Sequence, residues 1–218
     1  MDKSEILALR RAVLEKDFAR MNGRQKQAVF TVNGPLLILA GAGSGKTTVL
    51  INRIANILRY GDAYNSTYLR DDLDENDIAA CKAYIENGTP LTTESQEHLS
   101  VSACAPWRIM AITFTNKAAG ELKDRLCAML GETANDIWAS TFHSTCARIL
   151  RRDGERIGYS SHFTVYDTDD QRRLMKNILK ELEVRKKLLI RLMFLTDLSY
   201  IEKKRKYLST QLLSAVMM

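Results

Sequence analysis

The sequence predicts an α/β domain in which helices flank a parallel sheet. Residues 36–40 form a short, uninterrupted apolar run, which is typical of a strand buried on both faces. A glycine-rich loop and a segment of helical periodicity follow this run directly. The alternation of apolar run and amphipathic segment recurs further along the chain, as it does in parallel sheets with helical crossovers.

Local signals place the individual elements. The spacing of apolar residues predicts helices over residues 4–20, 24–32, 47–60, 75–86, 117–130, 144–157 and 169–182. Asn33, Gly34 and Pro35 end the second helix, because glycine and proline interrupt helical structure. Further strands are predicted at residues 108–114, 137–140 and 163–166.

The charge is unevenly distributed. The chain has 218 residues and a formal net charge of +6, yet residues 62–105 hold nine acidic and two basic side chains. We expect residues 61–105 to be an acidic insertion on the domain surface that contributes nothing to the core. The basic remainder favours a polyanionic partner such as nucleic acid, although charge runs are also common on solvated faces.

Several classes of protein are disfavoured. Four cysteines without a CxxC pair indicate free, mostly buried thiols in a reducing compartment, and neither they nor the three histidines have the spacing of a structural metal site. The apolar stretch at residues 188–201 contains Arg191 and Asp197 and is shorter than the ~20 residues of a spanning helix. No secretory leader is visible at the N-terminus. We therefore expect a cytoplasmic protein without membrane contact.

The glycine-rich loop fits the Walker A pattern. Its glycines let backbone N–H groups point at a phosphate, and the helix that follows adds its partial positive charge. We expect Lys46 to bridge the outer phosphates and the Thr47 hydroxyl to be a Mg²⁺ ligand, so these two are the candidate catalytic residues. A simple turn before a lysine is the alternative. The candidate nucleotide-binding residues are Ala40, Gly41, Ala42, Gly43, Ser44, Gly45, Lys46, Thr47 and Thr48.

An acidic magnesium ligand after a second buried strand is less evident. Asp74 and Glu75 follow no buried strand. Asp167 follows the predicted strand at residues 163–166, whose alternating pattern indicates half-exposure. Asp167 is the remaining candidate for this acid.

Three further stretches carry a resemblance to a family. Residues 21–29 resemble the Q motif, residues 112–119 resemble motif Ia, and residues 140–144 resemble motif Ic. Together with the loop, they resemble the N-terminal part of superfamily 1 DNA helicases of the UvrD/PcrA/Rep type. The resemblance implies an incomplete RecA-like P-loop NTPase fold, ATP and Mg²⁺ as cofactors, and single-stranded DNA as partner.

The resemblance also implies roles for individual residues. Gln25 would read the adenine base, near which Arg53 would lie, and Phe114 would stack on a DNA base. The implied DNA-binding residues are Thr113, Phe114, Thr115, Asn116, Lys117, Thr141, Phe142 and His143. Each of these residues also has an alternative without a functional role. Gln25 and Arg53 could be solvated helix residues, and His143 a structural histidine. Phe114 could be buried at a strand end, followed by a helix cap at Thr115 or Asn116.

The implied organisation has three parts. Residues 1–20 form an N-terminal helical extension, residues 21–167 the N-terminal part of the RecA-like 1A domain, and residues 168–218 the start of a helical 1B subdomain or a truncated end. The family's DExx motif and second RecA-like domain would lie beyond residue 218. We therefore expect a chain that binds nucleotide weakly and does not itself unwind DNA.

The implied parent protein is an ATP-dependent 3′-to-5′ DNA helicase acting in repair or replication. One alternative is a small P-loop phosphotransferase that uses Asp167 as its acid and Arg151 and Arg152 in a lid. A second alternative is a non-catalytic nucleic-acid-binding module.

Overall fold

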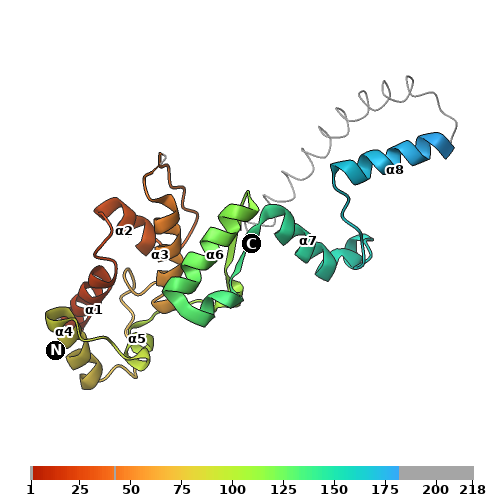
Figure 1. Cartoon of the computed structure of the whole chain (residues 1–218). Coiled ribbons are helices and arrows are strands. Elements are labelled where there is room, and N and C mark those ends of the chain that lie inside the picture. The colour runs from red at the N-terminus through yellow and green to blue at the C-terminus, as the bar shows by residue number, and fades with distance from the viewer. Residues whose placement is uncertain (1, 42, 182–218) are drawn as a thin grey trace. The chain divides into compact units, whose positions relative to one another are not determined.

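The computed structural model describes residues 2–41 and 43–181, in two compact units that divide between Ser161 and His162. The first unit contains the helices α1 (Lys3–Asp17), α2 (Gly23–Phe30), α3 (Lys46–Arg59), α4 (Glu75–Asn87), α5 (Thr93–Leu99), α6 (Asn116–Leu130) and α7 (Phe142–Asp153). It also contains the strands β1 (Met110–Thr113) and β2 (Trp138–Thr141) (Figure 1). Helix α8 (Thr168–Glu181) belongs to the second unit.

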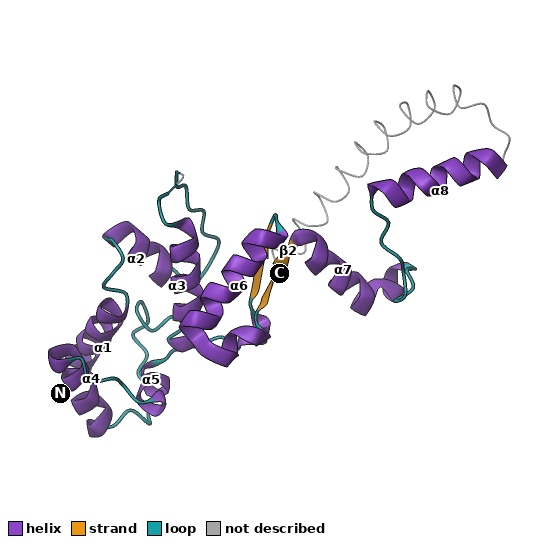
Figure 2. Ribbon diagram, in the orientation of Figure 1, coloured by secondary structure: helices purple, strands orange, loops and turns teal. Residues whose placement is uncertain are grey.

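The two strands form a parallel sheet, which confirms the predicted fold class. Met110 pairs with Trp138 and Thr113 with Thr141 in an unbroken register. Helix α6 connects the strands and packs on both of them (Figure 2). The strands predicted at residues 108–114 and 137–140 are thus confirmed; β1 is shorter than predicted, and β2 is shifted by one residue.

Two other predicted strands, at residues 36–40 and 163–166, are absent from the structure of these described residues. Residues 36–40 are irregular, with Leu37 81% and Leu39 86% exposed, and residues 163–166 are irregular as well. The physical reason is pairing: a central parallel strand needs hydrogen-bonded neighbours on its edges and helices on its faces. The only sheet in the described part of the chain consists of β1 and β2, and neither pairs with residues 36–40.

The predicted helices are present with small shifts at their ends. α5 is an addition that the sequence analysis did not predict. Side chains cap most N-termini: Asp2, Asn22, Asp74, Thr92, Thr115 and Thr141 each accept a backbone hydrogen bond from the first turn. Residues 182–218, with the apolar stretch at 188–201 and the expected start of a 1B subdomain, lie outside the described residues.

Two buried clusters form the core, and α3 contributes to both. One combines α1 and α2 with Val49 of α3, and the other combines Ile51 and Ile54 of α3 with β1 and α6. Helix α3 begins at the glycine-rich loop. Its position is therefore fixed by packing on two sides, which fixes the end of the loop as well.

The acidic insertion contributes to the core, contrary to the prediction. Ala63, Cys81, Leu91 and Leu99 are buried in the first cluster, against α1 and α2. The prediction failed because acidic residues and turn formers dominate the composition of this segment, whereas the apolar residues between them pack against α1. The insertion is closed at its base, where Asp62 N donates to Val101 O at 2.8 Å and Val101 N donates to Tyr60 O at 3.0 Å.

The cysteines are less buried than predicted. The four cysteines are free, but only Cys81 is buried, and burial raises the pKa of its thiol to about 11. Among the described residues, no helix has the length and apolar character needed to cross a bilayer, and no cluster of three or more His, Cys, Asp or Glu side chains could hold a metal ion.

Candidate functional site

The glycine-rich loop has the backbone geometry that its glycines permit. Gly43 and Gly45 have φ of +74° and +79°, in the left-handed region that favours glycine. Ser44 Oγ donates to Gly41 O at 2.7 Å across the turn. Ala42 lies outside the described residues. The loop thus turns tightly and leads directly into α3.

The start of α3 offers donors to an anion. Gly45 occupies the N-cap position and, having no side chain, provides no capping hydrogen bond. Lys46, Thr47 and Thr48 are exposed in the first turn, and Lys46 Nζ donates to Gly41 O at 2.6 Å and to Ala40 O at 3.1 Å. The ammonium group therefore lies at the loop itself. An uncapped helix N-terminus, an ammonium and hydroxyls form a donor set that fits a triphosphate with Mg²⁺.

Gln25 lies against this loop. Its Nε2 donates to Ser44 O at 3.3 Å, and its Oε1 accepts from Asn22 N at 3.0 Å in the capping box of α2. A Cβ on Gly45 would lie 3.1 Å from Gln25 Nε2. The structure therefore brings together two sequence features that lie 19 residues apart, the Q-motif glutamine and the loop.

Arg53 points from α3 to the end of α2. Its Nη1 donates to Ala28 O at 2.7 Å and also to Thr31 O. The side chain is half-buried, and this burial lowers the pKa of its guanidinium. The alternative of a solvated surface arginine is therefore wrong. The structure shows Arg53 joining α3 to α2, while a contact to a base stays a prediction.

The sheet brings the two predicted DNA-contact motifs to one edge. Thr113 and Thr141 are register partners at the carboxyl ends of β1 and β2, and Phe114 and Phe142 follow them. Phe114 is 97% exposed and Phe142 is 51% exposed. The alternative of a buried Phe114 is therefore wrong. Two aromatic rings lie at the edge where α6 and α7 begin.

The polar residues at this edge have defined roles. Thr115 Oγ1 accepts from Ala118 N at 3.2 Å and Thr141 Oγ1 accepts from Ser144 N at 3.3 Å, so both threonines cap the helices that follow. Asn116 and Lys117 are exposed in the first turn of α6. The exposed His143 lies edge-on to the Phe142 ring, with the two ring centroids 6.1 Å apart.

Asp167 caps a helix in the second unit. Its Oδ1 accepts from Asp169 N at 2.8 Å and from Asp170 N at 2.7 Å, at the start of α8. The carboxylate thus accepts hydrogen bonds from backbone N–H groups of the first turn of α8. Because residues 163–166 form no strand, the strand context that favoured Asp167 as a magnesium acid is absent from the structure.

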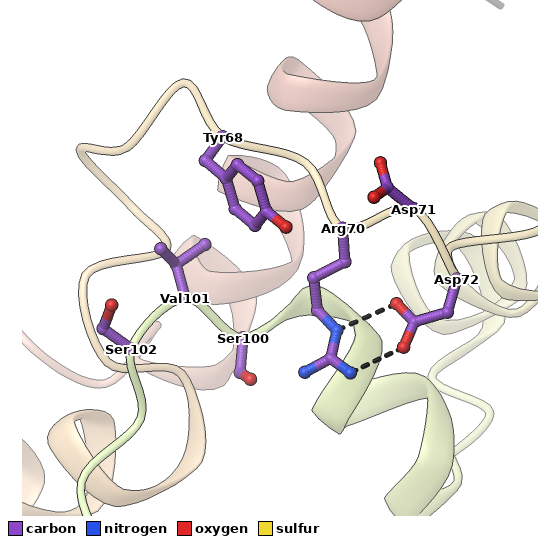
Figure 3. Close-up of a pocket in the computed structure, with 7 residues that line it drawn as sticks. All are labelled: Tyr68, Arg70, Asp71, Asp72, Ser100, Val101 and Ser102. Atoms are coloured by element: carbon purple, nitrogen blue, oxygen red, sulfur yellow. Dashed lines mark hydrogen bonds and ion pairs between the residues drawn. The ribbon is translucent and has the colours of Figure 1, made fainter.

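A separate open cavity of about 600 Å³ lies in the acidic insertion, away from the loop in sequence. Figure 3 shows Arg70 and Asp72 pointing toward one another, joined through Nε–Oδ1 at 2.8 Å and Nη2–Oδ2 at 2.6 Å. This pairing lowers the pKa of the Asp72 carboxyl to about 2. Because the Arg70 guanidinium is neutralised by Asp72, the cavity is a poor phosphate site. Its lining consists of Tyr68, Arg70, Asp71, Asp72, Ser100, Val101 and Ser102.

The loop, the helix that follows it and the parallel strands define an incomplete P-loop α/β domain. Comparison with known proteins narrows this class. The family model described as "UvrD/REP helicase N-terminal domain" matches residues 21–69 and 89–215. The chain belongs to this family.

Curated relatives agree with the family. The chain is 44% identical over 161 residues to the ATP-dependent DNA helicase PcrA of Bacillus subtilis, which covers 74% of the chain and 16% of the relative. It is 42% identical over 165 residues to PcrA of Leuconostoc citreum, covering 75% of the chain and 17% of the relative. It is 40% identical over 186 residues to PcrA of Staphylococcus epidermidis, covering 85% of the chain and 20% of the relative. The chain therefore spans a fifth or less of the length of these relatives.

Proposed function

We propose that this chain is the ATP-binding and single-stranded-DNA-binding part of an ATP-dependent 3′-to-5′ DNA helicase. Membership of the family supports a DNA helicase, and the names of the relatives support ATP dependence. The parent protein would unwind DNA in repair or replication, in the cytoplasm. Residues 21–167 would be the nucleotide-binding part, residues 1–20 an extension, and residues 168–218 the start of a helical subdomain.

The observation that carries the DNA proposal is the exposure of Phe114. A phenylalanine that is 97% exposed at a strand end gains nothing from the protein core. A base that stacks on such a ring contributes about 1–3 kcal/mol of affinity with little sequence preference. The N-termini of α6 and α7 at the same edge would provide backbone donors to phosphates.

The ATP proposal rests on the loop and on Gln25. Lys46 would hold the outer phosphates, Thr47 would be a ligand of Mg²⁺, and Gln25 would read the base through its amide. Magnesium bound there would neutralise charge on the phosphates. The residues of this chain would then bind and orient the nucleotide.

Unwinding would need parts outside this chain. Helicases of this class close two domains over ATP, so that hydrolysis changes the grip on the strand. We therefore propose that the isolated chain binds both ligands and has no unwinding activity.

The test is to measure ATP hydrolysis and DNA binding by the purified 218-residue chain. We expect salt-sensitive binding of single-stranded oligonucleotides of any sequence, with no ATP turnover that DNA stimulates. A chain that fails to bind single-stranded DNA at low salt contradicts the proposal. Turnover abolished by Lys46→Ala would instead favour the small P-loop enzyme.

A further inference from the structure

Two helices of this chain lie outside the residues that the family model matches, and they pack on one another. Residues 1–20 and 70–88 are unmatched, and they contain α1 and α4 (Figure 1). Lys16 Nζ, in the last turn of α1, donates to Tyr84 O at 2.6 Å and to Ile85 O at 2.7 Å, near the end of α4. We call α1 and α4 together the α1–α4 unit.

Two tyrosines strengthen this unit, one in α4 and one directly after α3. The hydroxyl of Tyr84 donates to Asp17 Oδ1, and the hydroxyl of Tyr60 donates to Asp17 Oδ2 at 2.5 Å. Burial and the Asp17 charge raise the pKa of Tyr60. Arg10, 2% exposed, donates from α1 to Ser66 O and Tyr68 O. Helix α1 is therefore anchored along the insertion.

The α1–α4 unit also holds α2 through Glu15. Lys26 Nζ, from α2, donates to the Glu15 carboxylate and to Glu15 O at 3.2 Å, and Tyr64 OH donates to Glu15 Oε1 at 2.8 Å. The Lys26 side chain is 21% exposed, so solvent screens this ion pair only in part. Lys26 is the neighbour of Gln25 along α2.

Aromatic packing fixes the other end of α2. The Phe30 ring stacks on Tyr64 with centroids 4.0 Å apart and meets the edge of Phe18, from the segment after α1, at 5.6 Å. Asn65 Nδ2 donates to Phe30 O at 2.7 Å. Arg53 of α3 donates to Ala28 O in α2 and to Thr31 O directly after it. Helix α2 is thus held between α1 with the insertion and the helix that begins at the loop.

These contacts matter because α2 cannot hold its own position. It has eight residues, and isolated helices of that length are marginal in water. The Gln25 amide reaches Ser44 O at 3.3 Å, near the outer limit of a hydrogen bond. A small rotation of α2 would therefore move the amide away from the loop.

We propose that the α1–α4 unit positions the base-recognition end of the nucleotide site, with Glu15 and Lys26 as positioning residues that hold Gln25 at the loop. This inference rests on the proposed function. It assigns to α1 and α4 the orientation of α2, and it assigns them no contact with the nucleotide.

The experiment compares ATP and GTP as competitors of a fluorescent ATP analogue, with Mg²⁺ and the 218-residue chain. Lys26→Met keeps the apolar stem and removes the ammonium. It should reduce the ATP-over-GTP preference by roughly two- to fivefold, the range for one partly exposed ion pair. Lys26→Arg should restore the preference, and Glu15→Gln should lower it as Lys26→Met does. Lys82→Met, an exposed lysine of α4, is the matched control and should leave the preference unchanged.

The outcomes distinguish a positioning role of Lys26 from a purely structural one. A purely structural role of Lys26 predicts that Lys26→Met lowers the melting temperature and weakens ATP and GTP equally, and this result overturns the inference. So does an unchanged preference in a variant that melts like the wild type, or a wild-type chain that binds ATP without preferring it to GTP. If Lys46→Ala fails to weaken ATP in the same assay, the proposed function itself is wrong.

Discussion

Thr113 and Thr141 lie opposite one another at the carboxyl ends of the two parallel strands, so that Phe114 and Phe142 begin from the same edge of the sheet. The two motifs that carry these residues are separated by more than 20 positions in the chain. Parallel pairing places them together because it aligns strand ends. The edge combines exposed rings with two helix N-termini, and this combination suits a strand of stacked bases linked by phosphates.

The first prediction concerns base stacking at this edge. Phe114→Ala should weaken binding of single-stranded DNA by at least about fivefold for every sequence, because a base–ring contact is lost. Fluorescence anisotropy with labelled oligonucleotides at low salt measures the change. Trp107→Ala is the control, because Trp107 is 67% exposed but precedes the amino end of β1. Equal losses in both variants would show that Phe114 has no special role.

A second prediction separates two tasks of Gln25. Its oxygen caps α2 while its amide donates to Ser44 O. Gln25→Glu keeps a capping oxygen and removes the amide donor, so it should melt near the wild-type temperature yet lose the preference for ATP over GTP. Gln25→Ala should both lower the melting temperature and lose the preference for ATP over GTP. An unaltered preference in Gln25→Glu, measured by nucleotide competition, contradicts the adenine-reading role.

The third prediction concerns closure of the insertion. A Cβ at Gly61 would lie 2.1 Å from Val101 O, and its φ is +58°. Gly61→Ala should reduce the free energy of unfolding by at least about 2 kcal/mol, since strain and overlap add. Gly88→Ala has φ of +75° but no atom within 4 Å of the new Cβ, so it should lose only about 1 kcal/mol. Urea unfolding of both variants compares them, and similar losses would mean that the base of the insertion can relax.

The fourth prediction concerns pH. A hydrogen bond from His98 Nδ1 to Asp77 Oδ2 raises the pKa of His98 above 6.5, with Asp72 and Glu94 adding to the shift. Protonated His98 therefore stabilises the folded chain below about pH 6.5, and this contribution is lost as the pH rises through the folded-state pKa. The melting temperature of the wild type should exceed that of His98→Gln at about pH 5.5, and the difference should shrink by about pH 8.5. A difference that grows with pH contradicts the assignment.

The sequence predicted what local signals decide. Helix ends came within a few residues because caps such as Asn22, with Gln25 three positions later, act over a single turn. Strands β1 and β2 were predicted from their apolar runs, and they form because each is the hydrogen-bonded neighbour of the other. The loop was predicted because its glycines are required by its backbone, as the positive φ at Gly43 and Gly45 shows.

Long-range contacts explain the rest. Residues 36–40 have the composition of a buried strand, yet a strand exists only where partners pair with it. Packing of Cys81 and Leu99 under α1 depends on contacts that no local pattern records. Lys26 and Glu15 were not singled out, because a lysine and a glutamate 11 positions apart on separate helices have no sequence signature.

Equilibrium titration of the chain with a fluorescent ATP analogue and Mg²⁺ measures whether the loop at residues 40–47 binds ATP. Lys46→Ala should weaken binding by roughly tenfold or more, because it removes a charge-assisted hydrogen bond to phosphate. Lys117→Ala, at the DNA edge, should bind the analogue like the wild type. Equal affinity of the wild type and Lys46→Ala for the nucleotide would contradict the account.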